Sequence, residues 1–304
     1  MIRGQRATLA LGGGGARGIA HLGAIEELLK AGFSFERIVG VSIGSMVGAL
    51  FAFEPDISRV QKQAGAFLNS PYFQRQQQHL LGTQFGAPAA GTIVSRYRRL
   101  ADSLRANRML YRAVRHSSIL PGELLEQVVN YLLPDADITD ARIPLIVVAV
   151  DLHTGRPVMF DKGPVRLAVR ASASVPGIFP PVVFKDKLLS DIGGFSDLTV
   201  GAARSYAANL LIAVDVGANL KPLANVPSAV EILLRMNDIG AALFREHVAA
   251  KADLVILPDV GHVDWFDFTS ADAMIAAGRA ATQSALQDFA PRPTWLERLF
   301  ARLP

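Results

Sequence analysis

The sequence has no cysteine among its 304 residues, so disulfide bonds, thiolate metal sites and a cysteine nucleophile are all excluded. It also lacks the roughly 18 consecutive apolar residues that a helix needs to cross a bilayer. The first six residues lead directly into a candidate strand, without the pattern of a secretory signal. Because half of the residues are hydrophobic and only 19% are charged, a mainly disordered chain is excluded. We expect a globular cytoplasmic protein, with at most a peripheral position at the inner membrane surface.

Acidic residues are almost absent between positions 57 and 121, where ten Lys and Arg residues face a single Asp. The whole chain has a net charge of only +4, so the remainder is slightly acidic. A basic region indicates an anionic partner: nucleic acid and an anionic membrane surface both fit, and a solvated helix face is the simplest alternative. Residues 54–121 contain no convincing core strand. We interpret them as a basic, mostly helical, lid-like insertion.

Short β-branched runs alternate with segments of helical periodicity in the rest of the sequence. The candidate strands are largely apolar on both faces, which is typical of a parallel sheet covered by helices on both sides. These strands comprise residues 8–11, 37–41, 143–150, 210–216 and 254–257, and the candidate helices comprise residues 19–30, 45–53, 123–132, 228–249 and 271–288. The alternation predicts a single α/β domain over residues 1–304.

A glycine-rich loop, Gly12 to Gly15, follows the first candidate strand and leads through Gly18 into a helix. The spacing of Gly13, Gly15 and Gly18 matches G-x-G-x-x-G, but the second strand does not end in the acidic residue that a dinucleotide site needs. A P-loop is excluded, because Lys and Ser or Thr do not follow Gly18. Glycine N–H groups at a helix N-terminus form an anion site, suited to phosphate or to a developing oxyanion.

A serine lies between the second candidate strand and the next helix, in the sequence Gly40-Val41-Ser42-Ile43-Gly44. The pattern G-x-S-x-G between a strand and a helix is typical of a nucleophile elbow, whose strained turn lifts the serine hydroxyl clear of the sheet. The N–H of Ile43 is then expected on the same side as the glycine loop. The motif predicts Ser42 as a nucleophile.

A serine nucleophile needs a base that accepts its proton. His262 is the only histidine placed late enough to follow an acid, as in an α/β-hydrolase. Three aspartates near strand ends, Asp151, Asp191 and Asp215, are candidates for direct proton transfer. Apolar residues lead into Asp191 and a glycine turn follows it, but spacing alone does not choose among the three.

These motifs resemble those of the patatin-like phospholipases, most closely the bacterial group related to the neuropathy target esterase domain. The resemblance runs from residue 9 to about residue 280 and rests on the ordered motifs at residues 12–23, 40–45, 170–181, 191–193 and 265–268. It implies a three-layer α/β fold with a central, mostly parallel sheet flanked by helices. It also implies a serine acyl hydrolase with a Ser–Asp dyad that works without histidine, metal or cofactor.

Carried over to this sequence, the resemblance makes Ser42 the nucleophile and Asp191 the base that activates first Ser42 and then the deacylating water. The backbone of the glycine loop would form the oxyanion hole, and the residues assigned to it or beside it are Gly13, Gly14, Gly15, Arg17, Gly18 and Ile43.

The third motif departs from the family pattern, which is Asp-Gly-Gly or Asp-Gly-Ala. Here Ile192 takes the place of the first glycine, and Gly193 follows it. If this position requires a positive φ, a β-branched residue is strained there and displaces Asp191. The turn would otherwise be supplied one residue later, by Gly193.

The resemblance implies a lipid ester substrate, either a phospholipid or a lysophospholipid, and no nucleic acid. Peripheral contact with an anionic membrane would involve the basic residues 57–121 and the amphipathic C-terminal tail 292–304. Packing of this tail on its own domain is the alternative. Two further functions remain open: a non-catalytic lipid-binding protein that lost turnover at Ile192, and an acyltransferase that uses Ser42 with an acceptor other than water.

Overall fold

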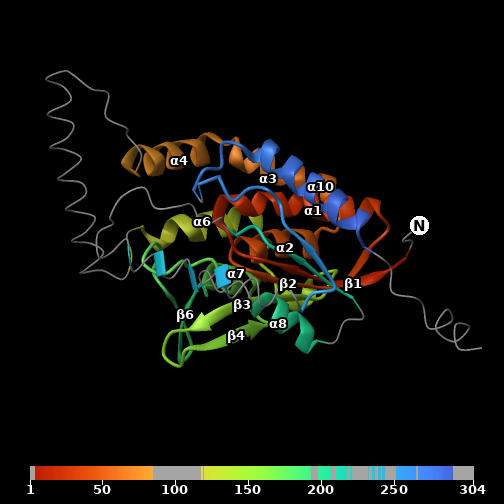
Figure 1. Ribbon diagram of the computed structural model, residues 1–304. Coiled ribbons are helices and arrows are strands. Elements are labelled where there is room, and N and C mark those ends of the chain that lie inside the picture. Colours follow the sequence, from red (N-terminus) through yellow and green to blue (C-terminus); the bar gives the residue numbers. More distant parts are fainter. Residues whose placement is uncertain are drawn as a thin grey trace, which may run out of the picture.

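The computed structural model describes residues 4–84, 118, 120–192, 198–206, 210–217, 220, 251–264 and 266–289, together with seven positions between 232 and 243. An eight-stranded sheet forms the centre of the molecule (Figure 1). Its strand order is β5-β6-β3-β2-β1-β7-β8, and β4 pairs with β3 as well. In the described part of the chain, no helix combines the length and the apolar character that crossing a membrane requires.

The parallel strands form most of the sheet and coincide with the five runs that the sequence analysis identified. They are β1 (Arg6–Leu11), β2 (Ser34–Val41), β3 (Leu145–Asp151), β7 (Leu211–Val214) and β8 (Leu254–Ile256). Three antiparallel strands extend the sheet around β3: β4 (Arg156–Phe160), β5 (Val182–Phe184) and β6 (Lys187–Ser190). These three strands were not predicted, because none has more than five residues.

Helices cover both faces of this sheet, so the predicted three-layer α/β fold is confirmed (Figure 1). Helix α8 (Leu198–Ser205) packs on one face, against β1 and β2. The other face and its outer layer carry α1 (Ala20–Lys30), α2 (Ile43–Phe53), α3 (Ile57–Leu68), α4 (Pro71–Gln84), α6 (Gly122–Leu132), α7 (Val165–Ser172) and α10 (Ala271–Gln287). Alternate residues of β2 enter the two cores, with Ile38 on the α2 side and Val39 on the α8 side.

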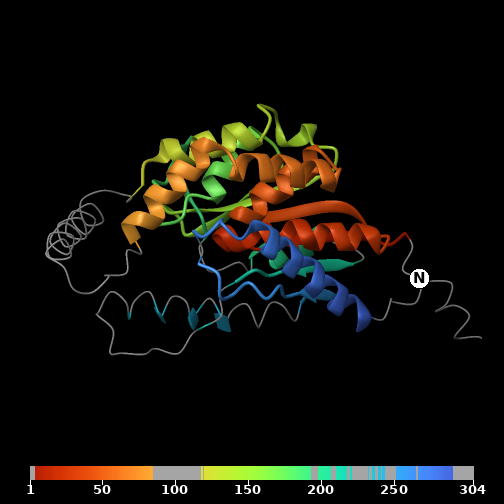
Figure 2. The same ribbon diagram turned by 90° about the horizontal axis from the view of Figure 1, so that it is seen from above.

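Helix α10 packs closely along α1, far from it in sequence (Figure 2). A Cβ atom at Gly23 would lie 2.0 Å from the carbonyl oxygen of Ile275, and a Cβ atom at Gly278 would lie 2.0 Å from that of Ala20. Since these neighbours are backbone atoms of packed helices, only glycine allows this approach. Helix α10 is thereby fixed against α1.

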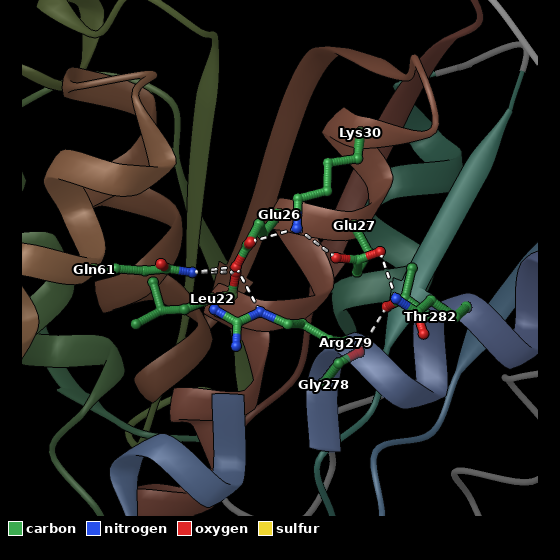
Figure 3. Close-up of polar contacts among 9 residues, drawn as sticks. Leu22, Glu26, Glu27, Lys30, Gln61, Gly278, Arg279 and Thr282 are labelled. Carbon is green, nitrogen blue, oxygen red and sulfur yellow. Dashed lines mark hydrogen bonds and ion pairs between the residues drawn. The ribbon is translucent and has the colours of Figure 1, made fainter. Parts of the chain in front are cut away.

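A charged cluster centred on Glu26 joins α1 to its two neighbouring helices (Figure 3). Its carboxylate accepts hydrogen bonds from Lys30 on the same helix, from Gln61 of α3 and from Arg279 of α10, at 2.6, 2.8 and 2.7 Å. Burial alone would raise the pKa of Glu26, but these hydrogen bonds outweigh it and lower the pKa to about 2. The cluster therefore requires Glu26 in its charged form.

Four of the five helices predicted outside the insertion are present, each beginning and ending within two residues of the predicted limits. The fifth, at residues 228–249, lies largely outside the described residues. Within the predicted insertion 54–121, helices α3 and α4 occupy the first part, while residues 85–117 lie outside the described residues, as does the tail 292–304. Helices α7 and α8 were not predicted.

Candidate active site

Ser42 lies in the turn between β2 and α2 with backbone angles of φ 54° and ψ −127°. Such a conformation costs a residue with a side chain on the order of 1–3 kcal/mol, so the surroundings must impose it. The Ser42 carbonyl accepts hydrogen bonds from the N–H groups of Ser45 and Met46, at 2.9 and 3.2 Å, and from the Ser45 hydroxyl at 2.6 Å. The first turn of α2 thus holds one side of the elbow.

The glycines of the elbow motif lie where the strand and helix backbones approach most closely. A Cβ atom at Gly44 would come within 2.2 Å of the Leu11 carbonyl oxygen, and one at Gly40 within 2.5 Å of the Gly44 carbonyl oxygen. A Cβ atom at Gly18 would overlap the side chain of Ile43, at 2.2 Å. These positions are restricted to glycine by close packing between the two loops of the site.

The glycine loop lies directly beside Ser42. A Cβ atom built at Gly13 would lie 3.2 Å from Ser42 Cβ and 3.9 Å from Ser42 Oγ. Among the described residues, none accepts a hydrogen bond from the N–H groups of Gly13, Gly14 or Gly15. Unpaired N–H groups beside a serine hydroxyl can bind an oxyanion. Ile43 is the first residue of α2, so its N–H lies at the positive end of the dipole of that helix.

Two side chains fix the carbonyl groups of this loop. Arg17 Nε donates to the Gly14 carbonyl at 3.0 Å, and His21 Nε2 lies 2.8 Å from the Gly12 carbonyl. His21 is fully buried, and this burial lowers its pKa from 6.5 to about 4, although the hydrogen bond to Gly12 acts to raise it. His21 is therefore a neutral histidine that supports the loop, as a packed residue of the first helix.

The sheet brings the end of β6 to the end of β2. Val148 of β3 pairs with both β2 and β4, so these two strands lie on opposite edges of β3. Val150 pairs with both β4 and β6, so β6 lies on the same edge as β2. Strand β2 runs parallel to β3 and β6 runs antiparallel to it, so their C-terminal ends point toward each other along one edge of β3.

Ser42 and Asp191 are the residues that follow these two strand ends. Val41 pairs with Val148 and Ser190 pairs with Val150, so two residues of β3, about 7 Å, separate the paired ends. By this register, Ser42 and Asp191 both follow their strands toward the intervening residue of β3, Ala149. Ser42 is 8% exposed and Asp191 is 3% exposed, so this meeting point is almost completely buried.

Ile192 does not have the strained conformation that its place in the third motif suggested. Among the described residues, the only non-glycine residues with a positive φ are Ser42 and Lys185. The side chain of Ile192 packs against the core on the α8 side of the sheet. Gly193 lies outside the described residues. Strain at Ile192, one of the two alternatives for this motif, therefore gives no reason for a displacement of Asp191.

The rival bases are arranged differently. The carboxylate of Asp151 accepts hydrogen bonds from the Thr154 hydroxyl and the His153 N–H, in the turn after β3, and from the N–H of Leu188 in β6. Burial alone would raise the pKa of Asp151, but these hydrogen bonds lower it below its ordinary value. Asp215 follows β7, two strands away from β2, and accepts from the Gly217 N–H at 2.8 Å. Of the three aspartates, only Asp191 directly follows a strand end that faces the end of β2 along β3.

His262 lies on the surface and does not reach the elbow. Its side chain is 69% exposed, and Nδ1 lies 3.9 Å from a carboxylate oxygen of Asp259. A catalytic histidine would have to lie within hydrogen-bond reach of Ser42. The described residues also contain no group of three or more His, Asp and Glu side chains that could hold a metal ion.

An apolar pocket opens beside Ser42, on the side of the sheet that carries α2. It encloses about 1230 Å³, including the part that is open to solvent. Among the described residues, the polar side chains in its wall are Ser42, Gln76 and Gln77, and no charged side chain lines it. The apolar wall is supplied by α2, α3, α4, α6 and the segment after α7, and includes Met46, Leu50, Phe67, Phe73, Leu125, Val128, Ala173 and Phe179.

The roles of Ser172 and Ser174 in this site were not assigned from the sequence. Ser172, at the end of α7, accepts a hydrogen bond from the Ser42 N–H at 2.8 Å. The Ser174 carbonyl accepts one from the Asp191 N–H at 2.9 Å. The run Ala171-Ser172-Ala173-Ser174 was noted only as a motif, because contacts across 130 positions leave no local signal in a single sequence.

Ser42 lies in a strained turn between a parallel strand and a helix, with a glycine loop and an apolar pocket beside it. This arrangement places the chain among the α/β proteins with a nucleophile elbow. Residues 9–203 match the family model described as patatin-like phospholipase. The chain belongs to the patatin-like phospholipase family, which confirms the resemblance found in its motifs.

Relatives extend over more sequence than this chain. It is 27% identical to an uncharacterized NTE family protein of Mycobacterium tuberculosis, over 94% of this chain and 47% of that protein. It is 31% identical to the lysophospholipase nte1 of Aspergillus fumigatus, over 70% of this chain and 12% of that protein. The chain thus spans half or less of the length of these relatives. Among solved structures, VipD from Legionella pneumophila is similar with a TM-score of 0.47 and 14% identity, over 93% of this chain and 67% of that one.

Proposed function

We propose that the chain is a serine acyl hydrolase that cleaves carboxylic ester bonds of phospholipids or lysophospholipids. The observation that carries this proposal is the position of Ser42, which is held in a strained elbow, in the wall of an apolar pocket and beside unpaired glycine N–H groups. Membership of the patatin-like phospholipase family and similarity to a protein named lysophospholipase support the same class of reaction.

Acylation begins when Ser42 Oγ bonds to the ester carbonyl carbon and its proton passes to Asp191. The carbonyl oxygen becomes an oxyanion, which the N–H groups of Gly13 to Gly15 and of Ile43 stabilise; one such donor is typically worth about 10²–10³ in rate. The ester C–O bond then breaks, and the alcohol leaves with the proton held by Asp191.

Deacylation repeats these events with water. Asp191 accepts a proton from the water molecule while the water oxygen bonds to the acyl carbon. The bond from the acyl carbon to Ser42 Oγ then breaks, and Oγ recovers the proton from Asp191. No histidine takes part in either half, and every proton transfer passes through the buried meeting point of β2 and β6.

The pocket beside Ser42 would hold the acyl chain of the substrate. Its wall presents apolar carbon almost everywhere, and ligand pockets of about 300–1,000 Å³ commonly bury most of a bound molecule. Since α3 and α4 supply part of this wall, residues 54–121 would act as the lid-like unit over the site. The basic residues 57–121 and the tail 292–304 would bring this opening to an anionic membrane surface.

Two measurements test the proposal. A fluorophosphonate probe should label Ser42 in the native chain and not in Ser42→Ala, and fatty acid should be released from phosphatidylcholine or lysophosphatidylcholine micelles. Absence of labelling would instead favour a non-catalytic lipid-binding protein. Transfer of the acyl group to an added alcohol in preference to water would favour an acyltransferase.

The acyl pocket is tested with p-nitrophenyl esters of increasing chain length. Val128→Phe, on the pocket side of α6, should shift the preferred substrate toward shorter acyl chains. Asn130→Phe, at an exposed position of the same helix, is the matched control and should leave the preference unchanged. Equal chain-length profiles for both variants would contradict the assignment of the pocket.

A further inference from the structure

One short segment, residues 172–174, holds both strand ends that meet at the site. Ser172 is completely buried, and its Oγ accepts a hydrogen bond from the Ser42 N–H at 2.8 Å while donating one to the Val148 carbonyl at 2.5 Å. Two residues later, the carbonyl of Ser174 accepts a hydrogen bond from the Asp191 N–H at 2.9 Å. The same carbonyl also accepts one from the buried hydroxyl of Ser190, at 2.7 Å.

We propose that Ser172 is a positioning residue for the nucleophile, and that residues 172–174 set the separation between Ser42 and Asp191. This inference rests on the proposed function, since it assigns a role in the reaction of Ser42. Both ends of the segment are fixed: Ser172 is tied to β3 through Val148, and the Ser174 hydroxyl donates to the Arg170 carbonyl within α7, at 2.8 Å.

The Ser42 main chain needs this support because β2 ends at Val41. Beyond that residue the strand ladder supplies no acceptor for the Ser42 N–H, whereas the Ser42 carbonyl is already held by the first turn of α2. Ser172 provides the missing acceptor and thereby fixes the second side of the strained elbow. Its hydroxyl must accept one hydrogen bond and donate another at the same time, which no aliphatic side chain can do.

The same hydrogen bond separates two kinds of N–H group in the site. The Ser42 N–H is engaged by Ser172 and is not free to bind an oxyanion. The N–H groups of the glycine loop and of Ile43 are left for that role. Loss of Ser172 would release the elbow without removing any group that touches the substrate. A displacement of about 1 Å at a reacting atom can cost about 10²-fold in rate.

The test compares Ser172→Thr with Ser172→Val, because these side chains have the same shape and differ in the hydroxyl. Fluorophosphonate titration gives the fraction of chains with a reactive Ser42, and kcat is then expressed per labelled site. Thr282→Val is the matched control: it removes another fully buried hydroxyl, which donates to the Gly278 carbonyl within α10. This control should change thermal stability and leave kcat per labelled site unchanged.

We expect Ser172→Val to have a kcat and a labelling rate constant about 10²-fold lower than Ser172→Thr. Its KM should agree within twofold, because the pocket is unchanged, and complete labelling should still be reached. Equal kcat per labelled site in the two variants, or a loss confined to the labelled fraction, would overturn the inference while the proposed function stands. If Ser172→Val does not fold, Ser172→Ala, which adds no atom, takes its place. A wild-type chain that neither labels nor hydrolyses esters would overturn both.

Discussion

The strained backbone of Ser42 leads to an unusual expectation for stability: glycine should be better tolerated than alanine at this position. Ser42→Gly and Ser42→Ala both remove the hydroxyl, but only glycine adopts φ 54° and ψ −127° without strain. The strain is on the order of 1–3 kcal/mol, and the extra entropy of glycine in the unfolded chain offsets roughly 0.5–1 kcal/mol of it. From the middle of both ranges, we expect Ser42→Gly to be more stable than Ser42→Ala by about 1 kcal/mol.

Urea unfolding of the two variants measures this difference as a shift of the midpoint at constant slope. In thermal unfolding, each kcal/mol should correspond to about 2–4 °C for a chain of this order of size. The matched control is Ser284, an exposed residue of α10, where Ser284→Ala should be more stable than Ser284→Gly by about 1 kcal/mol. If Ser42→Ala proves as stable as Ser42→Gly or more so, the elbow is not strained and the reasoning fails.

Three further outcomes are expected. Gly44→Ala would drive Cβ into a backbone oxygen at 2.2 Å, so it should cost about 3 kcal/mol of unfolding free energy and abolish activity. Gly48→Ala, whose Cβ would meet the Ile38 methyl group at 2.9 Å and no backbone atom, should cost less. The pKa of buried His21 is lowered to about 4, so the unfolded chain binds more protons than the folded chain between pH 6.5 and 4. The free energy of unfolding should therefore fall by up to about 3 kcal/mol as the pH is lowered through this window. A pH profile that does not differ from that of His21→Gln would contradict this. The pKa of Glu26 is lowered to about 2, so its contribution to the free energy of unfolding is complete above pH 4.5 and is lost toward pH 2. Glu26→Gln should lower the free energy of unfolding by about 1 kcal/mol at pH 7, a figure discounted for the partial exposure of Arg279, and should leave kcat unchanged.

Much of the fold follows from short-range patterns in the sequence. The parallel strands are buried on both faces, so they appear as continuous apolar runs, and the glycines and Ser42 lie in loops whose motifs are contiguous. These features could be predicted because every residue that defines them is near the others in the chain. The sequence left two alternatives for the third motif, and strain at Ile192 is excluded, since Ile192 has no positive φ.

The antiparallel part of the sheet could not be predicted in the same way. Strand β4 contains Pro157 and is half exposed, and β5 and β6 have three and four residues, too few for a periodic signal. The meeting of Ser42 with Asp191 depends on these strands, because β6 must return along the same edge of β3 as β2. The proposal of Asp191 rather than Asp151 as the base therefore rests on the strand pairing and could not come from spacing.

The central claim is that Ser42 and Asp191 form a dyad that hydrolyses esters without a metal ion. The most direct measurement is the hydrolysis of a medium-chain p-nitrophenyl ester, in the presence of EDTA, by the wild-type chain, Ser42→Ala and Asp191→Asn. We expect activity in the wild type and its loss in both variants, while all three remain folded. Full activity in Asp191→Asn, with Ser42→Ala inactive, would contradict the dyad and place the base elsewhere.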